Sequence, residues 1–203
     1  LLLTRRSENT PWYAGPTLTE ALEAAPTAAT AGTGAFAMPV QWVSRPDRSF
    51  RGFAGTIASG VVRKGDAVQV LPSGRTSKVK SIVTFDGEID EAFTPMSVTL
   101  TLEDELDVGR GDVIASRSAP PDCADQFEAR LLWLSASDLL PGRQYEARLH
   151  DCTVGATVTA IKHRVDVNSG AHLAARSVAR NEIALVNLSL DRPVPFEPYA
   201  RSR

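Results

Sequence analysis

The sequence predicts an all-β fold, with two small antiparallel β-barrels behind a short helical leader. Three observations support this fold class. Short segments rich in alternating, β-branched and aromatic residues follow one another from residue 38 onward. Turn sequences rich in Gly, Pro and Asp separate these segments at intervals of roughly ten residues. The same region carries no long helical periodicity. Together these features are typical of sheets that close into a barrel or sandwich.

The leader, residues 1–35, contains the predicted helix at 17–25. Thr17 can cap this helix, and Glu20 stands three residues later, where it completes a capping box. The helix would place its apolar residues on one face: Leu18, Ala21, Leu22 and Ala25. Residues 26–35, PTAATAGTGA, are small and polar, and we expect them to form a linker.

The first barrel is predicted at residues 36–117 and the second at 127–203, with a link at 118–126 that reads SAPPDCADQ from its first residue. In the first barrel, strands are expected at 38–44, 50–62, 66–72, 76–85, 97–103 and 109–116. In the second, they are expected at 127–134, 144–150, 152–163 and 181–190.

The glycine-rich stretch GFAGTIASGVVRKGD, residues 52–66, has the glycine spacing of a phosphate-binding loop. A P-loop requires a lysine and then a hydroxyl residue directly after its second glycine. Two valines follow Gly60, and Asp66 follows Gly65, so neither spacing meets this requirement. We therefore expect these glycines to serve strand bends and turns.

Composition excludes several classes of function. The net charge of −2 provides no general attraction to nucleic acid or to acidic membranes. No apolar run approaches the ~20 residues of a membrane-spanning helix. The two cysteines, Cys123 and Cys152, have no spacing that calls for a bond, so we expect free thiols in a cytoplasmic protein.

Several blocks of the sequence resemble a known family. The segment PWYAGPTLTEALEAA (11–25) resembles the last helix of the GTPase domain in elongation-factor-type GTPases, and residues 50–82 resemble their second, β-barrel domain. Three blocks resemble, more narrowly, the GTPase (large) subunit of bacterial sulfate adenylyltransferase: MPVQWVSRPDRSFRGFAGTIASG, SVTLTLEDELDVGRGDVIAS and NEIALVNLSLDRPVPFEPYA.

The resemblance implies that the barrels are elongation-factor-like domains 2 and 3. Members of this family pair with a small catalytic subunit, which converts ATP and sulfate to adenylyl sulfate and pyrophosphate while the large subunit hydrolyses GTP. In some members an adenylylsulfate kinase domain is fused at the C-terminus.

The GTP-binding motifs are absent from this sequence, so we expect a non-catalytic fragment that lacks the GTPase domain and binds no cofactor. GTP and Mg²⁺ are expected in that missing domain, and ATP in the partner subunit. Relatives continue past residue 200 with one more strand, so either the second barrel lacks its last strand or that strand is not included in this chain.

Arg51 and Arg110, in FRGF and GRGD, are the candidate interface residues. Arginine is enriched at interfaces, and these two could contact the GTPase domain or the small subunit. The alternative is that both are solvated turn residues. We expect no catalytic, cofactor-binding or metal-binding residue.

Other clusters suggest chemistry less specifically. A metal site could be imagined among His150, Cys152, His163 and His172, but their spacing fits no standard zinc pattern. The acidic run Glu103, Asp104, Glu105 and Asp107 is expected to be a solvated loop face rather than an acid–base pair.

A basic cluster supplies the alternative function. It consists of Arg63, Arg75, Lys78 and Lys80 around one hairpin. Translation factors use their second barrel near the 3′ end of tRNA, so the chain could instead provide nucleic-acid-binding barrels. The net negative charge argues against this alternative.

Overall fold

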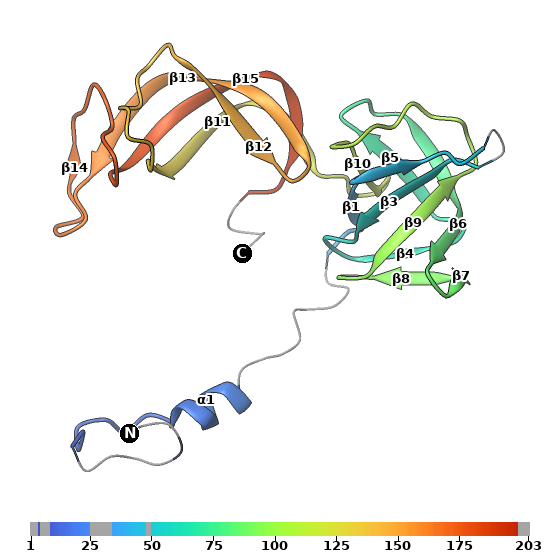
Figure 1. Cartoon of the computed structure of the whole chain (residues 1–203), viewed down its shortest axis with the longest axis horizontal. Coiled ribbons are helices and arrows are strands. Elements are labelled where there is room, and N and C mark those ends of the chain that lie inside the picture. The colour runs from blue at the N-terminus through green and yellow to red at the C-terminus, as the bar shows by residue number, and fades with distance from the viewer. Residues whose placement is uncertain (1–3, 5–8, 25–33, 48–49, 199–203) are drawn as a thin grey trace. The chain divides into compact units, whose positions relative to one another are not determined.

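The computed structural model describes residue 4 and residues 9–24, 34–47 and 50–198. Within them it is nearly all-β, with one short helix and fifteen strands (Figure 1). The chain divides into two compact units, Leu1–Ala31 and Gly32–Arg203, which we describe separately. None of the described helices is long and apolar enough to cross a membrane.

The first unit contains the helix α1, Leu18–Glu23. The predicted capping box is present: the Glu20 N–H donates to Thr17 Oγ1 at 3.3 Å, and the Thr17 N–H donates to Glu20 Oε2 at 2.7 Å. The helix ends earlier than predicted, with Ala24 at its C-cap. None of its residues is buried, and Leu22 is 65% exposed. Most of the predicted linker, 26–33, lies outside the described residues.

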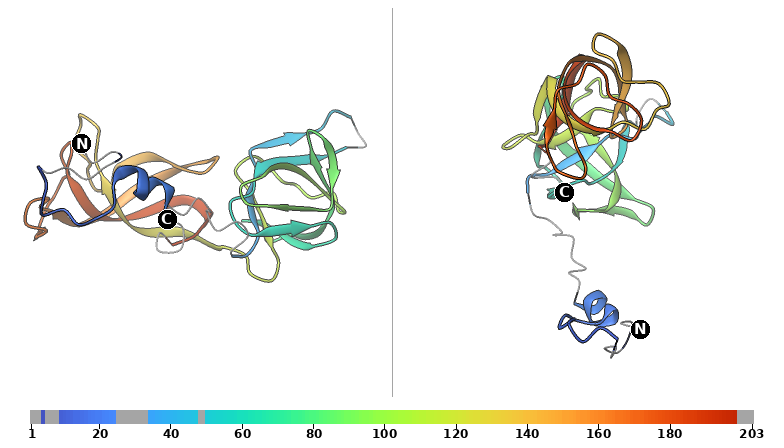
Figure 2. Two further views of the ribbon diagram at one scale, coloured as in Figure 1. Left: turned by 90° about the horizontal axis from the view of Figure 1, so that it is seen from below. Right: turned by 90° about the vertical axis from the view of Figure 1, so that its left-hand side faces the viewer.

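The first β-region contains ten strands, and Figure 2 shows its strands curving around a shared interior. They are β1 Ala37–Pro39, β2 Trp42–Ser44, β3 Gly52–Thr56, β4 Val61–Arg63, β5 Ala67–Leu71, β6 Thr76–Thr84, β7 Gly87–Ile89, β8 Glu91–Phe93, β9 Ser97–Leu102 and β10 Val113–Ser116. Eight of them form an antiparallel sheet in the order β1-β10-β5-β6-β9-β3-β2, with β7 beside β6. The other two, β4 and β8, pair with each other.

The segment predicted as one strand at 38–44 is in fact two. Val40 donates its N–H to the Asp112 carbonyl (2.8 Å), whereas Gln41 donates to the Ala54 carbonyl (2.8 Å). The chain therefore changes partner between these residues, and β1 pairs with β10 while β2 pairs with β3. The segment predicted at 50–62 likewise forms two strands, β3 and β4. Gly60, whose φ is 71°, lies directly before β4.

The interior of this region is a single apolar core. Its largest fully buried side chains include Met38, Phe53, Ile57, Leu100 and Ile114. Burying one such side chain contributes about 1.5–3 kcal/mol relative to leaving it in water. The alternation predicted in β6 is present at its start, where Ser77 and Val79 are buried between exposed neighbours.

The second β-region contains five strands, three of which have more than ten residues. They are β11 Asp122–Leu132, β12 Gln144–Leu149, β13 Cys152–Val165, β14 His172–Leu173 and β15 Ile183–Phe196. The sheet order is β11-β15-β13-β12, with β14 beside β13. β11 begins within the segment predicted as a link, and the two-residue β14 was not predicted.

Closure of the two barrels is not confirmed. Over the described residues, the pairing of the first sheet runs from β1 to β2, that of the second runs from β11 to β12, and neither returns to its start. Alternation along a strand indicates which side chains face inward, but it does not indicate which edges pair. The antiparallel, nearly all-β character is confirmed.

Candidate interface sites

Arg51 lies directly before β3, in the segment that joins β2 to β3. Its guanidinium carbon is 5.6 Å from the centre of the Phe53 ring, within the range of a cation–π contact. Its Nη2 is 3.7 Å from Asp107 Oδ1, but the Asp107 side chain is 95% exposed. The Arg51 Nε is buried and lacks a hydrogen-bond partner, the one such side-chain atom among the described residues. Arg51 is therefore only partly neutralised.

A cavity of about 340 Å³ adjoins Arg51. Three carboxylates of the predicted acidic run line it: Glu103, Asp104 and Glu105. The tertiary structure thus brings this run to the same site as Arg51, which the sequence did not predict. Asp104 accepts a hydrogen bond from Ser77 Oγ at 2.8 Å, so at least this carboxylate has an ordered position.

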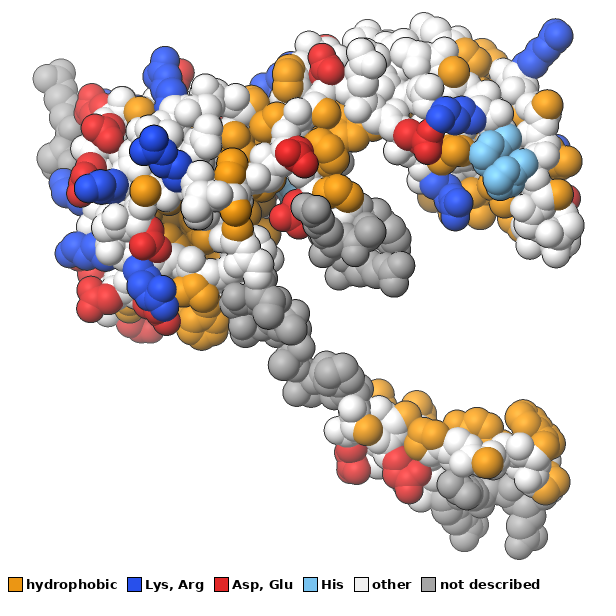
Figure 3. All heavy atoms as spheres, turned by 180° about the vertical axis from the view of Figure 1, so that it is seen from behind, with side chains coloured by type: hydrophobic (Ala, Val, Ile, Leu, Met, Phe, Trp, Pro, Cys, Tyr) orange, Lys and Arg blue, Asp and Glu red, His pale blue; other side chains and the backbone are white. Residues whose placement is uncertain are grey.

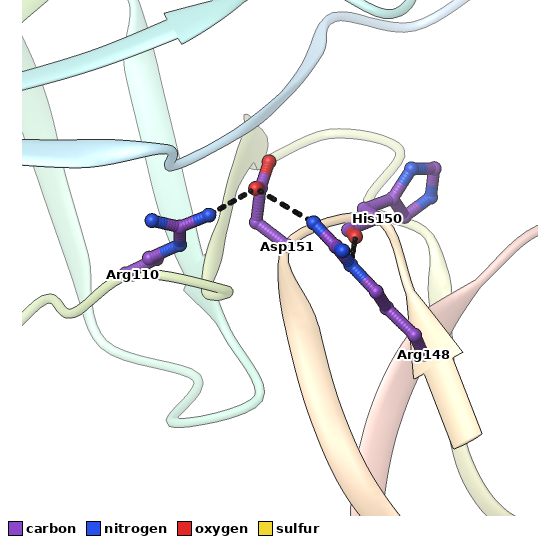
Figure 4. A network of polar contacts seen from close by, with 4 residues as sticks. All are labelled: Arg110, Arg148, His150 and Asp151. Atoms are coloured by element: carbon purple, nitrogen blue, oxygen red, sulfur yellow. Dashed lines mark hydrogen bonds and ion pairs between the residues drawn. The ribbon is translucent and has the colours of Figure 1, made fainter. Parts of the chain in front are cut away.

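Arg110 lies in the turn before β10 and reaches the second β-region. Its Nη2 donates to Asp151 Oδ1 at 2.9 Å (Figure 4). The Arg148 guanidinium lies 4.0 Å from the same oxygen, and its Nε donates to the His150 carbonyl at 3.3 Å. Asp151 therefore stands between two arginines, one from each β-region. Neither Asp151 nor Arg148 was singled out from the sequence, because nothing local to them signals this contact.

The turn that carries Arg110 is tightly built. Asp112 Oδ2 accepts from the Gly109 N–H at 2.8 Å. Burial raises the pKa of Asp112, and this effect outweighs the lowering by the Gly109 N–H and by the Arg192 charge. Gly111 has a φ of +90°, and a Cβ placed there would lie 3.0 Å from Cys152 Cα. The backbone thus approaches the second region too closely for a side chain at position 111.

Arg51 and Arg110 have different surroundings: Arg51 contacts Phe53 and Asp107, and Arg110 contacts Asp151. The structure does not bring the two candidates to one site. Whether either meets a partner remains a prediction.

The sequence did not predict a metal site at His150, Cys152, His163 and His172. Both cysteines are free, as predicted, and Cys152 Sγ accepts from Arg192 Nη2 at 3.1 Å. Partial desolvation raises the pKa of the Cys123 thiol, although the residue is exposed, and the nearby charge of Asp122 raises this pKa further. In the part of the chain that is described, no three His, Cys, Asp or Glu side chains are grouped so that they could hold a metal ion.

His163 and His172 are stacked, with ring centres 3.8 Å apart and planes inclined by 14°. Histidine side chains lie against one another beside charged residues in Figure 3. The pKa of His163 is lowered, first by desolvation and then by the nearby charges of His172 and Arg130. The sequence did not predict this pair, since it forms only when β14 folds back on β13.

The basic cluster is partly neutralised. Arg63 Nε lies 2.6 Å from Glu91 Oε2, across the pair formed by β4 and β8. Lys78 and Lys80 are both exposed on β6, where alternation places them on one face.

Comparison with known proteins identifies the relatives of this chain. Residues 126–203 match the family described as GTP-eEF1A C-terminal domain-like. The chain is 50% identical over 201 residues to the bifunctional enzyme CysN/CysC of Xylella fastidiosa, covering 99% of this chain and 32% of that protein. It is 43% identical over 201 residues to sulfate adenylyltransferase subunit 1 of Saccharophagus degradans, covering 99% of this chain and 43% of that protein. The chain thus spans about a third to two fifths of the length of these relatives.

Among solved structures, Sup35 complexed with GDP matches the whole chain and 50% of its own length, with a TM-score of 0.79 and 21% identity. The elongation factor SelB of Methanococcus maripaludis matches 82% of the chain and 37% of its own length, with a TM-score of 0.65 and 22% identity. At these identities the likeness shows the fold alone. The much higher identity to the curated relatives extends over nearly all of this chain: the chain is homologous to a segment of the sulfate adenylyltransferase subunit 1 and CysN/CysC proteins, as its motifs predicted.

Proposed function

We propose that this chain is the non-catalytic β-region of the GTP-hydrolysing subunit of sulfate adenylyltransferase. The observation that supports this proposal most directly is the identity of 43–50% over 201 residues to proteins of that name or of the name CysN/CysC. In this proposal residues 36–117 and 127–203 are two barrel domains, joined by residues 118–126, and residues 1–35 end the GTPase domain.

The parent protein would work in the cytoplasm as a heterodimer with the small catalytic subunit. That subunit would bind ATP and form adenylyl sulfate and pyrophosphate from ATP and sulfate. GTP and Mg²⁺ would bind in the GTPase domain of the parent protein.

The β-region would couple the nucleotide state of the GTPase domain to the catalytic subunit. A nucleotide can shift the partner only if its two states make different contacts with it. A pair such as Arg110 and Asp151, 2.9 Å apart between two β-regions, is suited to transmit a rigid-body movement from one region to the other. The residues we assign to this role are Arg51 and Arg110.

The direct test is to mix this 203-residue chain with the purified small subunit and to measure binding by calorimetry. We expect a saturable complex, and the GTPase-containing parent subunit serves as the positive control. If the parent subunit binds and this chain does not, the β-region does not carry a partner surface of its own.

A titration with aminoacyl-tRNA separates this function from the translation-factor alternative. Binding through phosphates weakens steeply as salt rises. We expect no measurable affinity even at low salt. Salt-dependent binding to tRNA would favour the alternative.

A further inference from the structure

The sheet of the second β-region ends in a strand with an open edge. β12 is the last strand in the order β11-β15-β13-β12, and over the described residues it pairs with β13 alone. Its six residues pair in one unbroken register without a bulge. They include no Pro or Lys, which commonly protect an edge from pairing with another strand. β12 therefore presents a regular row of backbone groups that another strand can pair with.

The other edge strands are less suited to such pairing. β1 and β2, at the ends of the first sheet, have three residues each, and β1 ends on Pro39. β4, β7, β8 and β14 have three residues or fewer. β11 has a bulge between Ala124 and Gln126, and its Glu128 already forms an ion pair with Lys162.

A hydrogen bond on the neighbouring strand indicates which backbone groups of β12 face outward. In an antiparallel pair, two opposite residues either exchange both hydrogen bonds or both turn away from each other. Gly155 lies opposite Glu146, and its N–H donates to Asp191 Oδ2 at 3.0 Å instead of to β12. Glu146 therefore turns its N–H and C=O toward the open edge. By alternation, Gln144 and Arg148 do the same.

The side chains of these outward-facing residues include one charge of each sign. Glu146 and Arg148 are both exposed and lie on the same face of the strand. Glu146 forms no ion pair with any residue that the structure describes. Arg148 is 4.0 Å from Asp151 Oδ1 with a side chain that is 68% exposed, so it is open to a closer partner. A second β12 strand, running antiparallel, carries the complement of each charge.

Charge selects one register for two antiparallel copies of β12. Outward-facing residues pair with outward-facing residues, so the possible registers place Glu146 opposite Glu146, Arg148 opposite Arg148, or Glu146 opposite Arg148. Like charges directly opposite each other are destabilising and opposite charges are stabilising, so the third register is favoured. It centres on Ala147 and brings Glu146 and Arg148 together twice, once on each side of a two-fold axis. On the other face it places Tyr145 opposite Leu149.

We propose that two copies of this chain associate through β12, in an antiparallel pair centred on Ala147 that continues the sheet across a two-fold axis. Glu146 and Arg148 of the two copies exchange backbone hydrogen bonds, and their side chains form two reciprocal ion pairs. A pair of six-residue strands is a small interface, so the association is weak. The inference does not depend on the proposed function, because it requires no other protein.

Sedimentation of the 203-residue chain over a concentration series measures the association. We expect an equilibrium between monomer and dimer. Glu146→Arg and Arg148→Glu each place like charges opposite each other twice, so each should weaken the dimer about tenfold or more. Glu88→Arg and Arg75→Glu, at exposed residues of the first β-region, are the matched controls and should change the dimer less than about twofold.

Two combinations of the variants restore complementary charges. The double variant Glu146→Arg/Arg148→Glu reverses both ion pairs, so its dimer should return to within about threefold of the unaltered chain. Mixing the two single variants should give a dimer of one chain of each kind, since one strand then carries two arginines and the other two glutamates. A variant that had merely misfolded would not recover on mixing.

Three results would overturn the proposal. The first is a chain that stays monomeric at millimolar concentration. The second is a pair of single variants that dimerise as strongly as the unaltered chain, since this would exclude β12 from the contact. The third is association that the double variant does not restore. That result would indicate pairing of β12 with β11 of the next copy, where Glu128 and Arg130 would meet like charges in the double variant.

Discussion

At the scale of single residues, the ion pair between Arg110 and Asp151 joins segments that are 41 residues apart in the chain. The Arg110 side chain is 58% exposed, so water screens the attraction. A double-mutant cycle with Arg110→Ala and Asp151→Ala should therefore give a coupling free energy of about 0.5–1 kcal/mol. Urea unfolding of the four proteins measures it.

The control for this cycle is Arg148, which is 4.0 Å from the same Asp151 oxygen. Its coupling to Asp151 should be smaller than that of Arg110. Equal coupling at both arginines would mean that Asp151 responds to the general positive charge around it and not to the specific contact.

The stacked pair His163 and His172 leads to a prediction about pH. The folded chain has a lowered His163 pKa, whereas the unfolded chain has the ordinary value of about 6.5. Below about pH 6.5 the unfolded state thus binds more protons, and the stability of the fold falls as the pH drops through this window. Replacing His172 by Gln removes one positive neighbour, so we expect the His163 pKa to rise.

NMR titration of the His163 ring protons measures this shift, with unfolding at pH 5 and pH 7 as the second readout. His172→Gln should also make stability less dependent on pH. A His163 pKa that stays the same in this variant would show that the charge of His172 does not contribute to the shift.

At the scale of elements, β3 depends on a glycine. A Cβ added to Gly55 would lie 2.2 Å from the Pro39 carbonyl oxygen in β1 and 3.1 Å from Met38 Cγ. Since backbone has to move to relieve this clash, Gly55→Ala should destabilise the fold by about 1–3 kcal/mol. Chemical denaturation measures the change.

The matched control is Gly109→Ala in the turn before β10. The nearest atom to an added Cβ there is Asp112 Oδ2, at 3.9 Å. We expect a change below about 0.5 kcal/mol. If the two variants were equally stable, β1 and β3 would have to be further apart in solution.

The helix α1 depends on its cap rather than on packing. Because none of its residues is buried, the reciprocal hydrogen bonds of Thr17 and Glu20 form a large part of its support. Thr17→Ala should cost about 1 kcal/mol of helix stability, and Thr17→Ser should retain most of it. Cα chemical shifts of residues 18–23 report the helical population. Equal populations in both variants would contradict the role of the cap.

At the scale of the whole molecule, the largest cluster of buried apolar side chains among the described residues lies in the first β-region. Leu100 is fully buried within it, whereas Leu132 at the end of β11 is 54% exposed. Leu100→Ala should destabilise the chain by about 2–5 kcal/mol, and Leu132→Ala by less than about 0.5 kcal/mol. Thermal unfolding compares them. A similar loss at Leu132 would indicate that a second surface covers it in solution.

The sequence by itself predicted the family resemblance, the β-rich class, the helix cap and the alternation at the start of β6. Each of these depends on residues close together in the chain or on short sequence motifs. Thr17 and Glu20 are three positions apart, and the alternation that buries Ser77 and Val79 in β6 has a period of two. Such local patterns can be seen without knowing the rest of the fold.

Only the tertiary structure decided which strand edges meet and which side chains share a site. The division of the segment 38–44 between β10 and β3, the pairing of Arg110 with Asp151, and the position of Arg51 beside the acidic run all depend on contacts between distant segments. Side chains alternate between the two faces of a strand whichever strand pairs with it. The alternation therefore specifies a face but not the neighbour that covers it.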